Sequence, residues 1–454
     1  MTSVVAFERF LMGYTLGAHI LIVTMSIALS VIISIAELMS LRLKDAYYEA
    51  IAKRFSKALV IFFAVGTASG TVLAVELFSL WPNFMVFIAK VDILPFYYEV
   101  FAFFLETVSL VLYVYYWDAF ENRYKHWALS LFVAVGTVMS AVFITMINAF
   151  MNTPSGFTLV NGQPTNINPL AAVANPSAFI EISHVVTTTI AAGSFLLLAY
   201  LAYSYLKDKA EESRRFYGKA ISLAAVVGFV ALVLAGISGD SSARMLLSLQ
   251  PLKYAAIELN LHPAINAPER IGGIFVNGHV EYYISIPGLQ SFLAFLSFNS
   301  KAQVPGLSMA PSSLWPPLFV HLTFDVMVGG GTLVGLFSLY LMYLIIIRRK
   351  IPTGKIALYG MLVSGILLQI VYDAGWVTDE VGRQPWIIYN VMTVAQAANT
   401  SPSVIPLGIA IVIFYLIVVP FTFYFAARVL RRETVEKQLE NVRGSRWYSS
   451  SIRK

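Results

Sequence analysis

The chain has 454 residues, of which 58% are hydrophobic and only 12% are Asp, Glu, Lys or Arg, and its mean hydropathy is +0.73. Soluble domains carry roughly a quarter charged residues, so this composition indicates a membrane protein with several spanning segments. The absence of Cys excludes disulfides, iron–sulfur clusters, thiol catalysis and covalently attached haem. The net charge of +6 fits basic residues on the cytoplasmic side of a membrane, and no basic cluster is typical of a nucleic-acid surface.

Nine apolar runs are long enough to cross a bilayer as helices. The sequence predicts these spans at 10–38, 57–80, 95–117, 127–150, 178–206, 219–237, 317–347, 356–374 and 404–427. Most of the 31 Lys and Arg residues follow the first, third, fifth, seventh or ninth span. This bias predicts an N-terminus outside the cell and a C-terminus inside. We therefore expect an all-α, polytopic bundle that forms one membrane domain over 1–454, with a long outer loop at 238–316 and a basic cytoplasmic tail at 428–454.

Two histidines, His19 and His184, lie inside predicted spans. Ionisable side chains are rare at membrane depth and usually face a functional interior. Neutral imidazole is a common axial ligand of haem iron, so the two positions favour a haem protein. The alternative is a pair of buried histidines that are hydrogen-bonded between helices. His321, near the start of the span 317–347, is a rival ligand.

Met327 lies at the same predicted depth as His184, in the outer half of its span. Most of the 14 methionines must be ordinary core residues, so only this depth singles it out. A His/Met pair would give a six-coordinate haem that transfers electrons and does not bind oxygen.

Glu99 and Glu106 are seven residues apart and therefore project from nearly the same face of one helix. Two stacked carboxylates could relay protons, and the alternative is a structural pair bonded to neighbouring helices. The densest polar segment near the membrane is 375–386, where Arg383 could pair with Glu380 or with haem propionates. That segment could instead be an interfacial turn anchored by tryptophans.

The run Glu380-Val-Gly-Arg-Gln-Pro-Trp386 resembles the signature of subunit I of the cytochrome bd quinol oxidases. The resemblance extends along nearly the whole chain. It includes Gly70, Phe103–Glu106, Trp117–Asp118, Asn148–Gly156 and the start of the outer loop, Gln250–Glu258.

The resemblance implies three haems, namely a low-spin haem b, a high-spin haem b and a haem d. It implies that His184 and Met327 ligate the low-spin haem, and that His19 and Glu380 ligate the two haems of the oxygen site. Which of those two haems each residue holds stays open.

The resemblance also implies roles for further residues. Glu99 and Glu106 would carry protons inward beside the oxygen site, where Glu380 would also take part in catalysis. Lys253 and Glu258 would bind quinol. A third group would support haem propionates or electron passage, namely Arg9, Trp376 and Arg383.

The implied function is a terminal respiratory oxidase in a prokaryotic plasma membrane. It would oxidise membrane quinol at the outer face, reduce O2 to water and contribute to the membrane potential without pumping protons. The implied partner is a subunit II or a paralogue of subunit I, with small accessory subunits possible in the complex.

Three features depart from the family pattern. Glu99 and Glu106 are one residue closer together than usual, and the segment Glu76–Trp81 is shorter than usual. Asp325 replaces an Arg two residues before Met327, which predicts a lower potential for the low-spin haem. Three alternatives remain open from the sequence: a haem oxidoreductase with another donor or acceptor, a transporter or channel, and a silent structural subunit.

Overall fold

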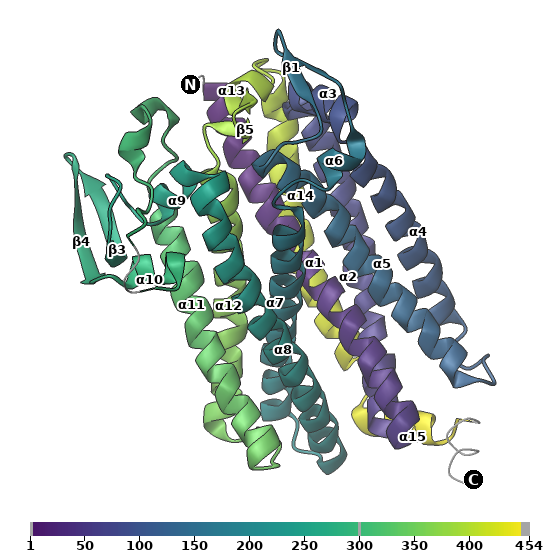
Figure 1. Cartoon of the computed structure of the whole chain (residues 1–454). Coiled ribbons are helices and arrows are strands. Elements are labelled where there is room, and N and C mark those ends of the chain that lie inside the picture. Colours follow the sequence, from purple (N-terminus) through teal and green to yellow (C-terminus); the bar gives the residue numbers. More distant parts are fainter. Residues whose placement is uncertain (1–2, 298–300, 446–454) are drawn as a thin grey trace.

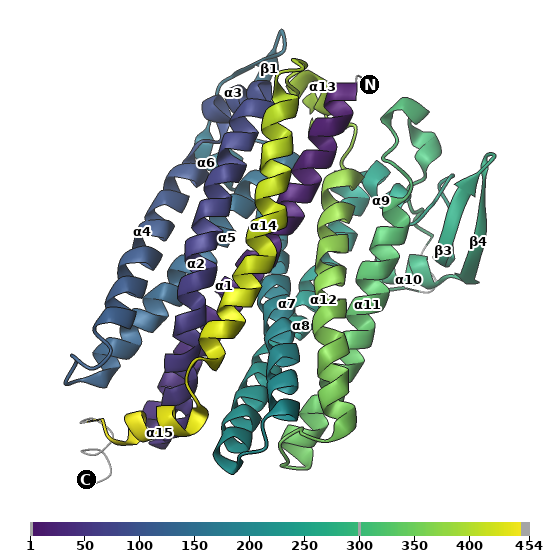
Figure 2. The same cartoon turned by 180° about the vertical axis from the view of Figure 1, so that it is seen from behind.

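The computed structural model describes residues 3–297 and 301–445. Within them, nine long apolar helices form one elongated bundle, which confirms the prediction of nine spans (Figure 1). The N-terminus lies at one end of the bundle, here called the N-terminal face. The short helix α15 (Val435–Arg443) lies at the opposite end, the C-terminal face (Figure 2). The orientation of these faces across the membrane stays a prediction.

The nine long helices are α1 (Ser3–Leu43), α2 (Ala46–Leu80), α4 (Leu94–Tyr115), α5 (Arg123–Asn152), α7 (Ala178–Lys207), α8 (Glu211–Leu249), α11 (Val320–Met342), α12 (Lys355–Gly382) and α14 (Val404–Arg431). A π-helical turn, η3 (Tyr343–Ile347), extends α11. Several helices continue beyond their apolar runs into polar sequence. As a result, the loop predicted at 238–316 begins as the last turns of α8, and most of the polar segment 375–386 is the end of α12.

Short elements connect the long helices. The helical ones are α3 (Pro82–Val91), α6 (Pro169–Val173), α9 (Pro251–Ile257), α10 (Leu289–Phe295), α13 (Val394–Ala397), η1 (Leu307–Met309) and η2 (Ser312–Leu314). Three antiparallel hairpins pair β1 (Thr158–Val160) with β2 (Gln163–Thr165), β3 (Glu269–Val276) with β4 (His279–Ile286), and β5 (Trp386–Ile388) with β6 (Met392–Thr393). The prediction of an all-α bundle therefore holds for the spans, while the connections add small sheets.

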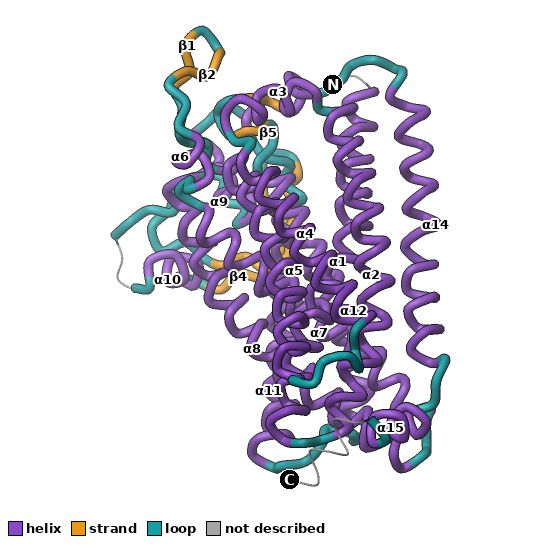
Figure 3. The backbone as a smooth tube through the Cα atoms, turned by 90° about the vertical axis from the view of Figure 1, so that its right-hand side faces the viewer, coloured by secondary structure: helices purple, strands orange, loops and turns teal. Residues whose placement is uncertain are grey.

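The outer loop builds a compact layer on the bundle. Figures 1 and 2 place the β3–β4 hairpin beside α11 at one edge, whereas α4 forms the opposite edge. In the hairpin, Ile271 pairs with Ile284 and Glu269 pairs with Ile286. Figure 3 shows α14 at the margin of the bundle, and this helix packs against α1 and α2.

Glycines allow the central helices to approach closely. A Cβ on Gly193 of α7 would overlap the carbonyl oxygen of Thr24 on α1, and a Cβ on Gly365 of α12 would lie 2.5 Å from the carbonyl oxygen of Phe195. Small residues at such contacts are typical of membrane helix packing. The helices α1, α7 and α12 are thereby held together as the frame of the candidate site.

Part of the predicted basic tail packs on the bundle. Val435, Leu439 and Val442 of α15 are buried. Gln438 accepts a hydrogen bond of 2.7 Å from Arg54 Nε on α2 and donates one of 2.9 Å to the carbonyl of Ala50. The described part of the segment 428–454 is therefore an ordered cover of the C-terminal face as well as a basic surface.

Candidate functional site

The two histidines predicted as ligands share one hydrogen-bond arrangement. Nδ1 of His19 lies 2.8 Å from Ser69 Oγ, and that hydroxyl donates to the carbonyl of Gly66 at 3.0 Å. Nδ1 of His184 lies 3.1 Å from Ser238 Oγ, which donates to a backbone carbonyl of its own helix at 3.0 Å. Because each serine hydroxyl donates its hydrogen to a backbone carbonyl, its oxygen accepts a hydrogen bond from Nδ1–H of the histidine. Nε2 of both rings is then the unprotonated nitrogen, which is the form that binds iron.

The other deeply buried histidines are engaged at both ring nitrogens. His126 contacts Glu37 Oε1 at 2.5 Å through Nδ1 and the carbonyl of Tyr113 at 2.9 Å through Nε2. His321 contacts the carbonyls of Ile257 at 2.6 Å and Gly272 at 2.8 Å. Both nitrogens of each ring therefore contact protein atoms, which favours His19 and His184 over His321 as the ligands.

A cavity of about 730 Å³ brings the expected His184 and Met327 together. It lies between α7, α8, α11 and α12, and Trp376, Lys253 and Glu258 also line it. Its volume is within the usual range for a cofactor pocket. The sequence placed His184 and Met327 at one depth, and both side chains line this one cavity in the structure.

Glycines on neighbouring helices make room for both ligands. A Cβ on Gly239 of α8 would lie 3.0 Å from Cε1 of His184, and a Cβ on Gly375 of α12 would lie 3.0 Å from Sδ of Met327. A Cβ on Gly70 would likewise lie 3.4 Å from Cε1 of His19. Each candidate ligand is therefore in close contact with a backbone that carries no side chain.

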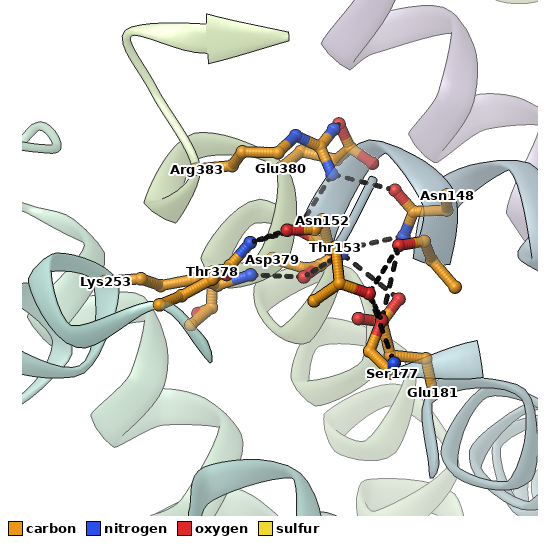
Figure 4. A network of polar contacts seen from close by, with 12 residues as sticks. Asn148, Asn152, Thr153, Ser177, Glu181, Lys253, Thr378, Asp379, Glu380 and Arg383 are labelled. Atoms are coloured by element: carbon orange, nitrogen blue, oxygen red, sulfur yellow. Dashed lines mark hydrogen bonds and ion pairs between the residues drawn. The ribbon is translucent and has the colours of Figure 1, made fainter. Parts of the chain in front are cut away.

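A polar network occupies the junction of α5, α7, α9 and α12 (Figure 4). Asp379 forms an ion pair with Lys253 and accepts hydrogen bonds from the side-chain amides of Asn148 at 2.6 Å and Asn152 at 3.2 Å. Arg383 is 2% exposed and donates to the amide oxygens of the same two asparagines at 3.0 Å each. Its second nitrogen, Nη2, lies 2.5 Å from Glu380 Oε2. The network therefore joins the start of the outer loop to an expected oxygen-site ligand.

The predicted quinol residues Lys253 and Glu258 line the same cavity but have different charge partners. The ammonium of Lys253 binds Asp379, whereas the nearest charges around Glu258 are Glu269, Asp325 and Arg270. Burial raises the pKa of Glu258 well above its usual range, and the two neighbouring carboxylates raise it further while Arg270 opposes them. The two predicted residues therefore act in distinct electrostatic settings.

Glu99 and Glu106 project from α4 toward α5. Ser140 Oγ donates to Glu99 Oε1 at 3.4 Å. A Cβ on Gly136, one turn before Ser140, would lie 2.8 Å from the backbone nitrogen of Glu106, and Glu106 is 3% exposed. Both carboxylates thus face α5 despite the spacing of seven residues, and Ser140 provides a hydroxyl at one of them.

Arg9 and Trp376 flank the signature run from different sides. Arg9 on α1 donates to the side chain of Gln384, directly after Arg383. Trp376 lies edge-on to Tyr372, with ring centroids 6.5 Å apart, and lines the cavity of His184 and Met327. Arg9 is therefore tied to the signature run and Trp376 to the cavity.

Asp325 faces the outer loop. Its Oδ2 accepts a hydrogen bond of 2.5 Å from the backbone nitrogen of Gly272 in β3 and lies 3.4 Å from Nε2 of His321. The expectation that Asp325 lowers the potential of a nearby haem remains a prediction. Its carboxylate has a structural partner that the sequence did not indicate.

Sequence reasoning missed the supporting residues. They are Ser69 and Ser238 beneath the histidines, Asn152, Glu181 and Gln250 in the network, and Glu269 in the cavity wall. Serines that contact a histidine across two helices leave no periodic signal. Asn152 and Gln250 lie inside the runs Asn148–Gly156 and Gln250–Glu258 that resemble the family, and this was the available indication.

The residues present fit haem binding. Two imidazoles make their hydrogen bonds through Nδ1, a thioether lines the same cavity as one of them, and a carboxylate is held by an arginine. Within the described residues, Arg383 Nε and Asp373 Oδ1 are buried without a hydrogen-bond partner. Buried unpaired polar atoms are costly in a finished structure, so they indicate a ligand that completes the site.

Comparison with known proteins is consistent with this chemistry. Residues 7–434 match the family described as cytochrome bd terminal oxidase subunit I. The chain is 35% identical to a putative cytochrome bd menaquinol oxidase subunit I of Bacillus subtilis (strain 168), over 95% of this chain and 97% of the relative. It is 28% identical to the cytochrome bd ubiquinol oxidase subunit 1 of the same strain, over 91% of each chain.

A solved structure shares the fold. The bd oxidase from Geobacillus thermodenitrificans superposes with a TM-score of 0.89 at 35% sequence identity. The match covers 95% of this chain and 99% of that chain. Both the arrangement of the nine helices and the additions between them therefore have a counterpart.

Proposed function

Because the chain belongs to the cytochrome bd terminal oxidase subunit I family, we propose that it is the haem-bearing subunit of a respiratory oxidase that oxidises membrane quinol and reduces O2 to water. Family membership implies haem cofactors, a quinol substrate and a membrane-bound complex with a second subunit. The nine apolar helices and the family make the chain a multi-pass plasma membrane protein. Nothing in the site favours a transporter or channel over this oxidase.

One observation carries the proposal: His184 and Met327 share a cavity with Lys253 and Glu258. His184 and Met327 would hold a low-spin haem b, with Ser238 fixing the tautomer of His184. His19 and Glu380 would hold the high-spin haem b and the haem d of the oxygen site, with Arg383 fixing Glu380 and Arg9 fixing the adjacent loop. The haems, when bound, supply electron transfer and oxygen reduction.

The chain's own residues handle protons and quinol. Glu258 accepts a proton from a quinol hydroxyl, and Lys253 positions the quinol oxygen from its place beside Asp379. Glu99, Ser140 and Glu106 form a short relay on α4 and α5 for protons that are consumed in water formation. If the N-terminal face is outside, quinol protons leave there while consumed protons come from inside. The reaction then contributes to the membrane potential without a pump.

The partner is proposed to be a subunit II or a paralogue of subunit I, with small accessory subunits also possible. The strongly exposed apolar side chains on α4, such as Phe101 and Phe104, offer one surface for a partner or for lipid. The relay at Glu106 ends inside this chain, so the partner is expected to complete the proton path.

The test is a reduced-minus-oxidised visible spectrum of the purified complex, with the haems extracted and identified, together with quinol-driven O2 uptake. We expect low-spin b, high-spin b and chlorin-type d signals, and loss of the low-spin signal in Met327→Leu. Only b-type haem would remove the assignment of haem d. A folded complex without haem would overturn the proposal.

A further inference from the structure

Two side chains of α11 anchor the outer loop by contacting the backbone of a single residue, Gly272. Nε2 of His321 contacts the carbonyl oxygen of Gly272 at 2.8 Å, and Asp325 Oδ2 accepts from the backbone nitrogen of Gly272 at 2.5 Å. His321 and Asp325 are one helical turn apart on α11, so they reach the free edge of β3 together. We call this arrangement the Gly272 clamp.

The clamp uses both ring nitrogens of His321. The second nitrogen, Nδ1, lies 2.6 Å from the carbonyl oxygen of Ile257. The ring is 1% exposed, and Asp325 Oδ2 lies 3.4 Å from its Nε2. His321 thereby fixes the end of α9 and the strand β3 to the same helix.

Both backbone positions that the clamp fixes lie within three residues of a glutamate. Ile257 immediately precedes Glu258, and Gly272 follows Glu269 by three residues in β3. Glu258 is 6% exposed and makes no side-chain hydrogen bond within the described residues. Glu269 Oε2 is buried and also has no hydrogen-bond partner there. Both side chains line the cavity that holds Lys253.

We propose that Glu269 is a second proton acceptor for the quinol, in the same cavity as Glu258, and that the Gly272 clamp positions the two carboxylates. This inference rests on the proposed quinol oxidation. A quinol that becomes a quinone loses two electrons and two hydroxyl protons. The electrons pass to the oxidase and finally to O2, which is the terminal oxidant. One hydroxyl proton goes to Glu258 and the other to Glu269, and each carboxylate then releases its proton to water at the loop surface.

The surroundings suit Glu269 to this role. Burial and then Asp325 raise its pKa to about 6, whereas His321 and Arg270 lower it. Tyr254 on α9 and Glu258 complete the ionisable groups around it. Near neutral pH the side chain is therefore mostly ionised but still binds a proton readily, which is what a general base needs. The guanidinium of Arg270 is held away by Asn260 at 2.8 Å, so it does not neutralise Glu269 directly.

The test compares Glu269→Gln, Glu269→Asp and Glu281→Gln in the complete oxidase. Glu281 lies on the same hairpin, is exposed and faces solvent, so it is a matched control. O2 uptake is measured between pH 5.5 and 8.5 with a short-chain quinol, and separately with an electron donor that releases no protons. The haem spectrum of each variant reports whether it has folded.

We expect Glu269→Gln to lower kcat for quinol at least tenfold, with KM changed less, and to remove the acid limb of the pH profile near pH 6. Glu269→Asp should restore part of the rate, and the proton-free donor should support the wild-type rate throughout. His321→Gln removes contacts that hold the backbone near Glu258 and Glu269 in place. It should therefore lower kcat for quinol as Glu269→Gln does, with an unchanged haem spectrum.

Two results would overturn the proposal. One is a wild-type pH profile and kcat in Glu269→Gln. The other is an equal loss with both donors, which would indicate a structural role. A wild-type complex that takes up no O2 with any quinol would refute the proposed function itself, and this outcome is distinct from both. If Glu269→Gln fails to fold, the pH profile of Glu269→Asp decides, because a shorter carboxylate should shift the acid limb.

Discussion

The contact between the Ser238 hydroxyl and His184 predicts how tightly the low-spin haem is retained. Ser238→Ala removes the hydroxyl acceptor 3.1 Å from Nδ1 of the half-buried His184 ring. Losing such an outer partner of a metal-bound histidine typically costs about 10- to 100-fold in affinity, or about 1.4 to 2.7 kcal/mol. We therefore expect weaker binding of the low-spin haem with an unchanged fold.

The control for this variant is one turn away on the same helix. Ser241 donates to the carbonyl of Ile237 at 3.0 Å, as Ser238 does to Leu234, but it has no histidine partner. Ser241→Ala thus removes the same hydroxyl and the same back-bond. Any extra effect of Ser238→Ala belongs to the contact with His184.

The assay is the rate at which each purified variant loses haem to an excess of apomyoglobin. It is combined with the amplitude of the low-spin signal in the reduced-minus-oxidised spectrum. Ser238→Ala should lose its low-spin haem about 10- to 100-fold faster than Ser241→Ala does. Ser69→Ala should instead affect the haem held by His19 and leave the low-spin signal intact. Equal rates for Ser238→Ala and Ser241→Ala would refute the assignment of the tautomer.

Three further predictions follow from other contacts. Gly375→Ala places a new Cβ 3.0 Å from Sδ of Met327, so it should displace that sulfur and reduce the low-spin signal. Gly329→Ala is the control, because a Cβ there would meet no atom within 4 Å and should leave the signal unchanged. Arg383→Lys keeps the charge but cannot reach Asn148, Asn152 and Glu380 together, so O2 uptake should fall at least about tenfold. Within the described part of the chain, both carboxylate oxygens of Asp92 are buried without a hydrogen-bond partner, and burial raises its pKa to about 7. Ionising Asp92 therefore opposes folding as the pH rises from about 4 through 7. Asp92→Asn should therefore raise the thermal unfolding temperature at pH 8 but not at pH 4, with a gain of no more than about 4 kcal/mol.

The sequence predicted the spans because a bilayer imposes a length and a polarity on each helix. It also predicted that His184 and Met327 lie at one depth, since depth follows from position within a span. Helix ends were less predictable. The helix α12 continues to Gly382 through residues whose polarity resembles a loop, because its last turns are stabilised by the network around Asp379.

The sequence indicated that Arg383 could pair with Glu380, as it does in the structure, but it could not predict the partner of Lys253. Lys253 and Asp379 are 126 positions apart, and Glu258 was an equally plausible partner from sequence order alone. The choice depends on how α9 lies across the end of α12. There a Cβ on Gly382 would lie 3.1 Å from Cγ of Lys253, so the lysine stem crosses a backbone without a side chain. The same limit applies to Asp325, whose partner Gly272 lies in a strand that no periodic pattern indicated.

The two asparagines at the end of α5 explain how the loop and the oxygen site are connected. An amide side chain both donates and accepts, so Asn148 and Asn152 each donate to Asp379 and accept from Arg383. A carboxylate or an amine at either position would lose one of these two functions. Lys253 binds Asp379 and Arg383 binds Glu380. If quinol binds at Lys253 as proposed, we expect Asp379 to become more dependent on the asparagines and the charge balance beside Arg383 and Glu380 to change. The expected coupling requires no movement of a helix, only a change of partner for one ammonium group.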